Sequence, residues 1–204
     1  MRDEDAPEFY LRAGGPHWGS RRRGIATVAA CTLLLTAWDA WPQASTSSEY
    51  AVKSAFLLHF AQFAEWPASA FKDANAPLTF CVLGEHEFLG TLDESISGKT
   101  IGNRTLRVQH LKELQEATAC QVIFVGSDDK KRIPALFASL KDAPVLTVGD
   151  TENFAQNGGM IGLFLEDSKI RFEINLGSVE HAKLRINAKL LALAKTVIGG
   201  SRGN

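Results

Sequence analysis

The residues best suited to chemistry in this sequence are two cysteines, Cys81 and Cys120. A cysteine acts as a nucleophile or metal ligand when it is exposed and readily forms a thiolate. Both cysteines lie in or beside apolar segments, where burial lowers the reactivity of a thiol. Three interpretations remain open on these residues alone: a disulfide, two buried thiols, or a redox-sensitive pair.

A second candidate is the acidic and imidazole-bearing run Glu85-His86-Glu87, which follows an apolar segment and Gly84. Loops after strands of an α/β sheet often bind ligands, and carboxylates and imidazoles are metal ligands. Adjacent side chains do not converge on one ion, however, and no second cluster stands nearby in the sequence. We therefore interpret the run as a solvated loop and predict no metal site.

Standard catalytic and cofactor-binding motifs are missing from the sequence. No serine lies in a Gly-x-Ser-x-Gly turn, and neither a phosphate-binding loop nor a dinucleotide fingerprint occurs. His59, His110 and His181 lie in segments where packed or surface histidines are more common than general bases. We predict a protein that is not an enzyme, with no catalytic residues and no cofactor.

The charge balance argues against nucleic acid as a partner. The 204 residues include 22 lysines and arginines and 23 aspartates and glutamates, for a net charge of −1. Proteins that bind nucleic acids need an excess of cations for the phosphates. We therefore expect no nucleic-acid partner.

The N-terminal part of the chain is typical of a secretory signal peptide. Three arginines at 21–23 precede an apolar run at 24–38, and small polar residues follow. The run is shorter than the roughly 20 residues that a membrane-spanning helix needs. Cys31 ends a lipoprotein-like box, but the apolar run continues beyond it, which favours an ordinary cysteine. We predict an N-terminal extension and cleaved signal peptide over 1–44, and one periplasmic domain over 45–204.

Export to an oxidising compartment favours pairing of the two remaining cysteines. Cys81 and Cys120 are then the only cysteines of the exported chain. In the chain-entropy model, closing a loop of about 39 residues stabilises a fold by about 4 kcal/mol.

The exported chain opens with a strongly apolar segment, Glu49–Trp66, which we predict to be a helix that ends before Pro67. Val52, Phe56 and Phe60 recur at helical spacing and form one apolar stripe. Such a stripe packs in the core in most proteins and binds a partner in fewer. We retain Phe56 and Phe60 as candidate partner contacts.

Short apolar runs then alternate with polar helical segments, which is typical of an α/β domain with a mostly parallel sheet and flanking helices. The expected strands are 78–83, 105–108, 121–125 and 144–148, and the expected helices are 87–96, 111–116, 129–141 and 151–157.

The end of the chain predicts a hairpin followed by a helix. Segments 160–165 and 169–174 are separated by a turn-forming cluster, so we expect an antiparallel hairpin at the edge of the sheet. Arg171 and Glu173 alternate with apolar residues and lie on one face of the second strand, where they are candidate partner contacts. Residues 179–198 are predicted to form one helix.

Several blocks in this order resemble the YfiR family of periplasmic proteins. These blocks are EYAVKSAFLLHFAQFAEWP, FCVLG, CQVIFVG and the segment from VLTVGDTENFAQNGG to LALAKTV, and the resemblance covers residues 48–198. It implies a non-catalytic regulator that binds and represses the periplasmic domain of an inner-membrane diguanylate cyclase. Such a repressor lowers cyclic-di-GMP and biofilm formation. An OmpA-like outer-membrane lipoprotein as a second partner and a homodimer are further implications.

The resemblance extends to one of two cysteine pairs. Cys81 and Cys120 match a pair that forms a disulfide in the family's type member, whereas a second pair near VGDTENFAQNGG is absent here.

A different class of function remains open beside the repressor. A periplasmic sensor of a small ligand, coupled to a histidine kinase or an outer-membrane receptor, would have a pocket at the carboxyl ends of the strands.

Overall fold

The computed structural model describes residues 43–84 and 86–199. Cys31 and Glu85 of the acidic run lie outside these residues. The predicted extension and signal peptide over 1–44 also lies outside them, except for residues 43 and 44. The boundary between 44 and 45 remains a prediction.

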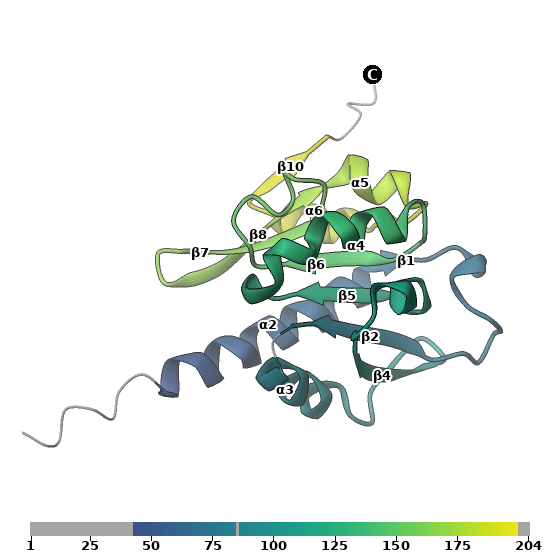
Figure 1. The fold of residues 1–204 in the computed structure, drawn as a ribbon, viewed down its shortest axis with the longest axis horizontal. Helices are drawn as coiled ribbons and strands as arrows, with labels where there is room; N and C mark the ends of the chain where they lie inside the picture. The colour runs from purple at the N-terminus through teal and green to yellow at the C-terminus, as the bar shows by residue number, and fades with distance from the viewer. Residues whose placement is uncertain (1–42, 85, 200–204) are drawn as a thin grey trace, which may run out of the picture. The chain divides into compact units, whose positions relative to one another are not determined.

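The domain is built on one mostly parallel sheet of eight strands (Figure 1). In spatial order the strands are β10 (Thr196–Ile198), β8 (Lys169–Asn175), β7 (Ile161–Glu166), β6 (Leu146–Gly149), β5 (Val122–Val125), β2 (Leu78–Leu83), β4 (Arg104–His110) and β3 (Thr100–Ile101). Neighbours pair in parallel from β4 through β2, β5 and β6 to β7, and the β7–β8 and β3–β4 pairs are antiparallel. This confirms the predicted fold class.

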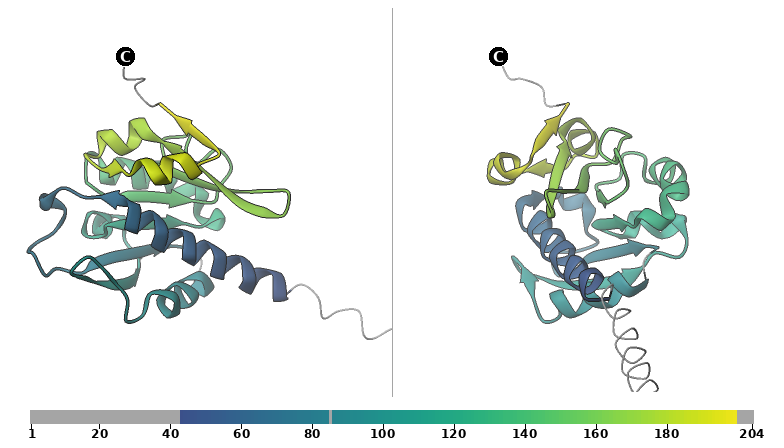
Figure 2. Two further views of the ribbon diagram at one scale, coloured as in Figure 1. Left: turned by 180° about the vertical axis from the view of Figure 1, so that it is seen from behind. Right: turned by 90° about the vertical axis from the view of Figure 1, so that its left-hand side faces the viewer.

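Helices cover both faces of this sheet, as a parallel sheet requires. The α2 helix (Gln43–Phe63) and α3 (His86–Ile96) pack on one face, and α4 (Ile133–Leu140) packs on the other (Figures 1 and 2). The helices α5 (Leu176–His181) and α6 (Ala188–Leu193) contribute to the same core as α2. A separate pair of short strands, β1 (Ala64–Glu65) and β9 (Arg185–Ile186), joins the end of α2 to the loop after α5.

The apolar stripe of α2 belongs to the core. The rings of Phe56 and Phe60 lie 5.7 and 5.0 Å from the ring of Phe172 in β8. Phe60 has 0% of its surface exposed, so its side chain offers no area to a partner, and Phe56 is half-buried. The expected partner contact at Phe60 is therefore corrected: the residue packs α2 against the hairpin.

The region after residue 175 differs from the single predicted helix. It forms α5, β9, α6 and β10, because Asn175 and Asn187 each cap a new helix by accepting a hydrogen bond from a backbone N–H, that of Ser178 or Lys189. The strand β10 then pairs with β8, so the hairpin does not form the edge of the sheet as expected.

Three of the other predicted helices also differ. Residues 151–157 form turns rather than a helix, and the segment predicted at 111–116 is a 3₁₀ helix, Leu114–Ala119. The segment predicted at 129–141 begins as a 3₁₀ helix, Ser127–Arg132, and continues as α4.

The turns at 150–157 are held by one aromatic ring. Phe154 is buried in the core beneath α4, and a Cβ atom on Gly149 would lie 2.5 Å from its Cδ2 atom. A Cβ atom on Gly159 would overlap the same ring. The two glycines therefore leave the space that the ring fills, and this packing fixes the loop that follows β6.

We expect Gly159→Ala to lower the free energy of unfolding by roughly 1–3 kcal/mol, because the added methyl group displaces the buried ring of Phe154. Gly90→Ala in α3 is the matched control. A Cβ atom there meets nothing within 4 Å, so alanine should stabilise the helix by up to about 1 kcal/mol. Urea unfolding of both variants checks the pair. Equal effects would contradict the role assigned to Phe154.

Candidate functional site

The candidate site lies where the parallel strands β5 and β6 end. Ser127 follows β5 and Asp150 follows β6, so both lie at the carboxyl edge of the sheet. Open α/β sheets bind ligands outside this edge. The N-terminal half of α2 approaches the same edge and brings Glu49, Tyr50 and Lys53 to it.

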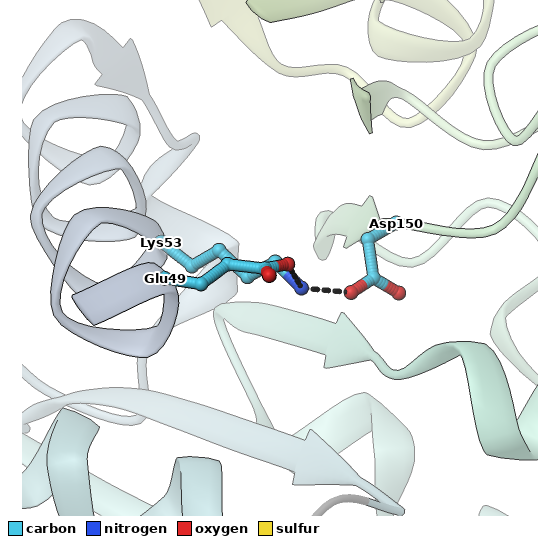
Figure 3. Close-up of polar contacts among 3 residues, drawn as sticks. All are labelled: Glu49, Lys53 and Asp150. Atoms are coloured by element: carbon cyan, nitrogen blue, oxygen red, sulfur yellow. Dashed lines mark hydrogen bonds and ion pairs between the residues drawn. The ribbon is translucent and has the colours of Figure 1, made fainter. Parts of the chain in front are cut away.

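Lys53 is the central residue of the site. Its side chain is only 7% exposed, and its ammonium group forms ion pairs with Asp150 and, at 2.8 Å, with Glu49 one turn earlier (Figure 3). The ring of Tyr50 lies 5.8 Å from the same ammonium group. The Lys53–Asp150 pair ties α2 to the end of β6 across 97 positions of sequence.

The electrostatics of the site favour a charged lysine. Burial by itself would lower the pKa of Lys53. The hydrogen bonds that Lys53 donates to Asp150 and Glu49, together with the negative charges of these carboxylates, outweigh burial and raise the pKa above its ordinary value. On the lysine side, the raised pKa contributes stability that is fully present below about 10.4, the pKa of an unfolded lysine, while the carboxylates are ionised. This contribution is lost as the pH rises through the folded pKa of Lys53. We therefore expect no titration of Lys53 near neutral pH.

Three cavities meet at Asp150. One of about 310 Å³ lies between α2 and the hairpin, and one of about 420 Å³ lies between the hairpin and the 150–157 turns. The third, of about 820 Å³, lies between these turns and the start of α4. Concave space is thus concentrated at the carboxyl edge of β6.

The predicted contact residues of the hairpin lie on its face away from α2. Arg171 is exposed, and its Nε atom lies 3.9 Å from Oε2 of Glu166, which also pairs with Lys195 at 3.0 Å. Glu173 accepts a hydrogen bond of 2.7 Å from Gln156. The structure therefore places Arg171 at an accessible position and ties Glu173 to the 150–157 turns.

Cys81 and Cys120 are joined by a disulfide, with their Cα atoms 5.9 Å apart. Both are buried in the core beneath α4. The bond links β2 to a position two residues before the start of β5, so it braces two neighbouring strands. Its position in the core indicates a bracing role in the fold.

Sequence reasoning missed the Lys53–Asp150 pair. Asp150 directly precedes the segment 151–157, which the sequence predicts to be a helix, and that helix does not form. One signal was available. Lys53 is the only lysine or arginine in the apolar segment 49–66, where a buried cation needs an anionic partner.

The described residues contain neither a cluster of metal-ligating side chains nor a helix able to cross a membrane. In the parts of the chain that the structure describes, no three histidine, cysteine, aspartate or glutamate side chains form a cluster that could hold a metal ion. Over the same residues, no helix combines the length and apolarity needed to cross a membrane.

A comparison with protein families matches residues 50–195 to the YfiR/HmsC-like family. The chain belongs to this family. The match covers α2 from residue 50 onward, the strands from β2 to β8, and both residues of the Lys53–Asp150 pair. The YfiR/HmsC-like family is one of periplasmic, regulatory proteins in cyclic-di-GMP signalling that act through a signalling partner.

Two solved structures are similar to part of this YfiR/HmsC-like chain. One is described as the ABC domain in complex with L-Trp from Streptococcus pneumonia, with 12% identity and a TM-score of 0.43. The other is a conserved domain protein from Vibrio cholerae, with 13% identity and a TM-score of 0.47. Each match covers 59% of this chain, and it spans 55% of the first and 54% of the second structure.

We expect Lys53→Met to lower the free energy of unfolding by about 3–5 kcal/mol, because it leaves the largely buried Asp150 carboxylate without its cation. The double variant Lys53→Met/Asp150→Asn should recover most of this loss. Glu49→Gln should cost only about 0.5 kcal/mol, because Glu49 is half exposed and pairs within one helix. Urea unfolding of the three variants provides the values. A double variant as unstable as Lys53→Met would contradict the assigned pairing.

Proposed function

We propose that this protein is a periplasmic regulator that binds and represses a membrane-bound diguanylate cyclase, and so lowers cyclic-di-GMP and biofilm formation. Export through a signal peptide within 1–44 is part of the proposal. The observation that carries it is the family match over residues 50–195, which includes almost all of the described domain. An OmpA-like outer-membrane lipoprotein and a second copy of the chain are proposed as further partners.

The β7–β8 hairpin is the proposed contact region for the cyclase. Leu165 near its tip is 70% exposed, and Arg171 is exposed on the opposite face. Protein interfaces combine an apolar centre with a polar rim, and arginine is frequent among the residues that dominate binding. Arg171 remains the proposed polar anchor, whereas Phe60 is excluded by its burial.

A second function is favoured by a specific observation. The three cavities at Asp150 lie at the carboxyl edge of the sheet, and Lys53, Glu49 and Asp150 converge there. This is the arrangement expected of a small-ligand sensor coupled to a histidine kinase or an outer-membrane receptor. The two functions differ in their effect on cellular cyclic-di-GMP.

We expect deletion of the gene to raise cellular cyclic-di-GMP, and the wild-type gene to restore the original level. Arg171→Ala should restore it only in part, whereas Arg107→Ala, at an exposed position of β4, should act as the wild type. Cys81→Ser should reduce the amount of folded protein, because loss of the disulfide costs about 4 kcal/mol. Cellular cyclic-di-GMP is measured by nucleotide extraction, and the amount of the protein is measured in the same cells. Unchanged cyclic-di-GMP on deletion would contradict cyclase repression and favour the ligand sensor.

A further inference from the structure

The outer half of the β7–β8 hairpin is a two-stranded arm. β7 pairs with β6 only at Ile161 and Gly162, because β6 ends at Gly149. On the other side, β8 pairs with β10 only over 173–175. Figures 1 and 2 show the arm extending past the neighbouring strands. On the side away from β8, the edge of β7 from Leu163 onward therefore has no neighbouring strand among the described residues.

The register of the hairpin sets the direction of the backbone groups at this edge. Asp167 and Ser168 have φ values of +48° and +58° and form a two-residue turn, which places Glu166 opposite Lys169. Opposed residues in an antiparallel pair alternate between bonding each other and bonding outward. Asn175 N–H donates to the carbonyl of Met160 at 2.8 Å, so the even-numbered residues of β7 bond to β8. The N–H and C=O groups of Leu165 consequently point outward.

Two cavities flank this edge. The 310 Å³ cavity lies on its α2 side and the 420 Å³ cavity on its other side, and both are lined by Asp150 and by 163–165. A strand added along β7 would lie beside β7 in line with β6, beyond the point where β6 ends at Gly149. Its alternating side chains would enter the two cavities in turn.

The lining of the two cavities is acidic. The carboxylates of Glu49, Asp150, Glu152 and Glu173 face a single cation, Lys53, which gives a net charge of −3. Glu49 is 49% exposed, and Glu152 is also exposed, so both are accessible to a bound segment.

We propose that the free edge of β7 binds an extended segment of a protein partner as an added strand. The segment carries lysine or arginine at alternate positions, and these side chains enter the 420 Å³ cavity lined by Asp150, Glu152 and Glu173. Strand addition uses backbone hydrogen bonds for affinity and side-chain pockets for specificity. An exposed apolar edge strand is otherwise a liability that proteins avoid. The inference rests on the proposed function in one respect: the partner that supplies the segment is the regulated cyclase.

Two capped decapeptides serve as probes of the edge, one alternating lysine with valine and one alternating glutamate with valine. We expect the lysine peptide to bind the purified protein roughly tenfold more tightly in fluorescence anisotropy, and its affinity to fall with added salt. Leu165→Pro removes the outward N–H and should abolish binding, whereas Leu165→Met should retain it. Glu49→Gln/Glu152→Gln should weaken binding, and the control Asp93→Asn/Glu94→Gln on α3 should not. Thermal unfolding checks that each variant is folded.

The outcomes separate the inference from the proposed function. Equal binding of both peptides, or lysine-peptide binding that survives both Leu165→Pro and the double glutamine variant, would overturn the added strand. The periplasmic domain of the cyclase is measured in parallel. If it fails to bind while the lysine peptide behaves as expected, only the proposed function falls. If it binds and Leu165→Pro has no effect, the edge is not its contact. If the protein is a dimer that Leu165→Pro dissociates but neither peptide dissociates, the edge binds a second copy of the chain. That result would overturn the proposal.

Discussion

The packing of α2 across the sheet is the interaction on which the rest of the structure depends. Phe56 and Phe60 hold the helix against Phe172, and the Lys53–Asp150 ion pair fixes its N-terminal half at the end of β6. A buried ion pair contributes little net stability compared with apolar residues, since desolvation offsets its Coulomb energy. Its role here is to fix the position of α2 on the sheet. Apolar contacts alone permit sliding of a helix on a sheet, whereas the ammonium group must meet one carboxylate.

The early end of β6 creates the free hairpin arm. After Gly149 the chain turns into the 150–157 segment, which Phe154 holds in the core beneath α4. The second cysteine pair of the YfiR family's type member, which lies near this segment, is absent from this sequence. The ring of Phe154, enclosed by two glycines, supplies a non-covalent means of holding the same loop. Because the loop leaves the plane of the sheet, β7 continues without a neighbour and the cavities at Asp150 open beside it.

Much of the fold is predictable from local pattern. The apolar runs of β2, β5 and β6 and the turn-forming cluster of the hairpin identify these elements, because strands buried on both faces are apolar throughout. The region after residue 175 is not predictable in this way. Its leucines and alanines favour one long helix, but the caps at Asn175 and Asn187 and the pairing of β10 with β8 prevail. The Lys53–Asp150 pair is also beyond local pattern, since only the folded chain brings residues 97 positions apart together.

In our proposal, a regulated partner docks at the hairpin arm and the adjacent carboxyl edge of the sheet. Hydrogen–deuterium exchange of the protein, alone and with the periplasmic domain of the cyclase, tests it most directly. We expect slower exchange on complex formation at the backbone of 163–166, and unchanged exchange in β4 and the adjacent α3, toward the opposite edge of the sheet. Protection confined to β4 and β3, with none in the hairpin, would contradict it.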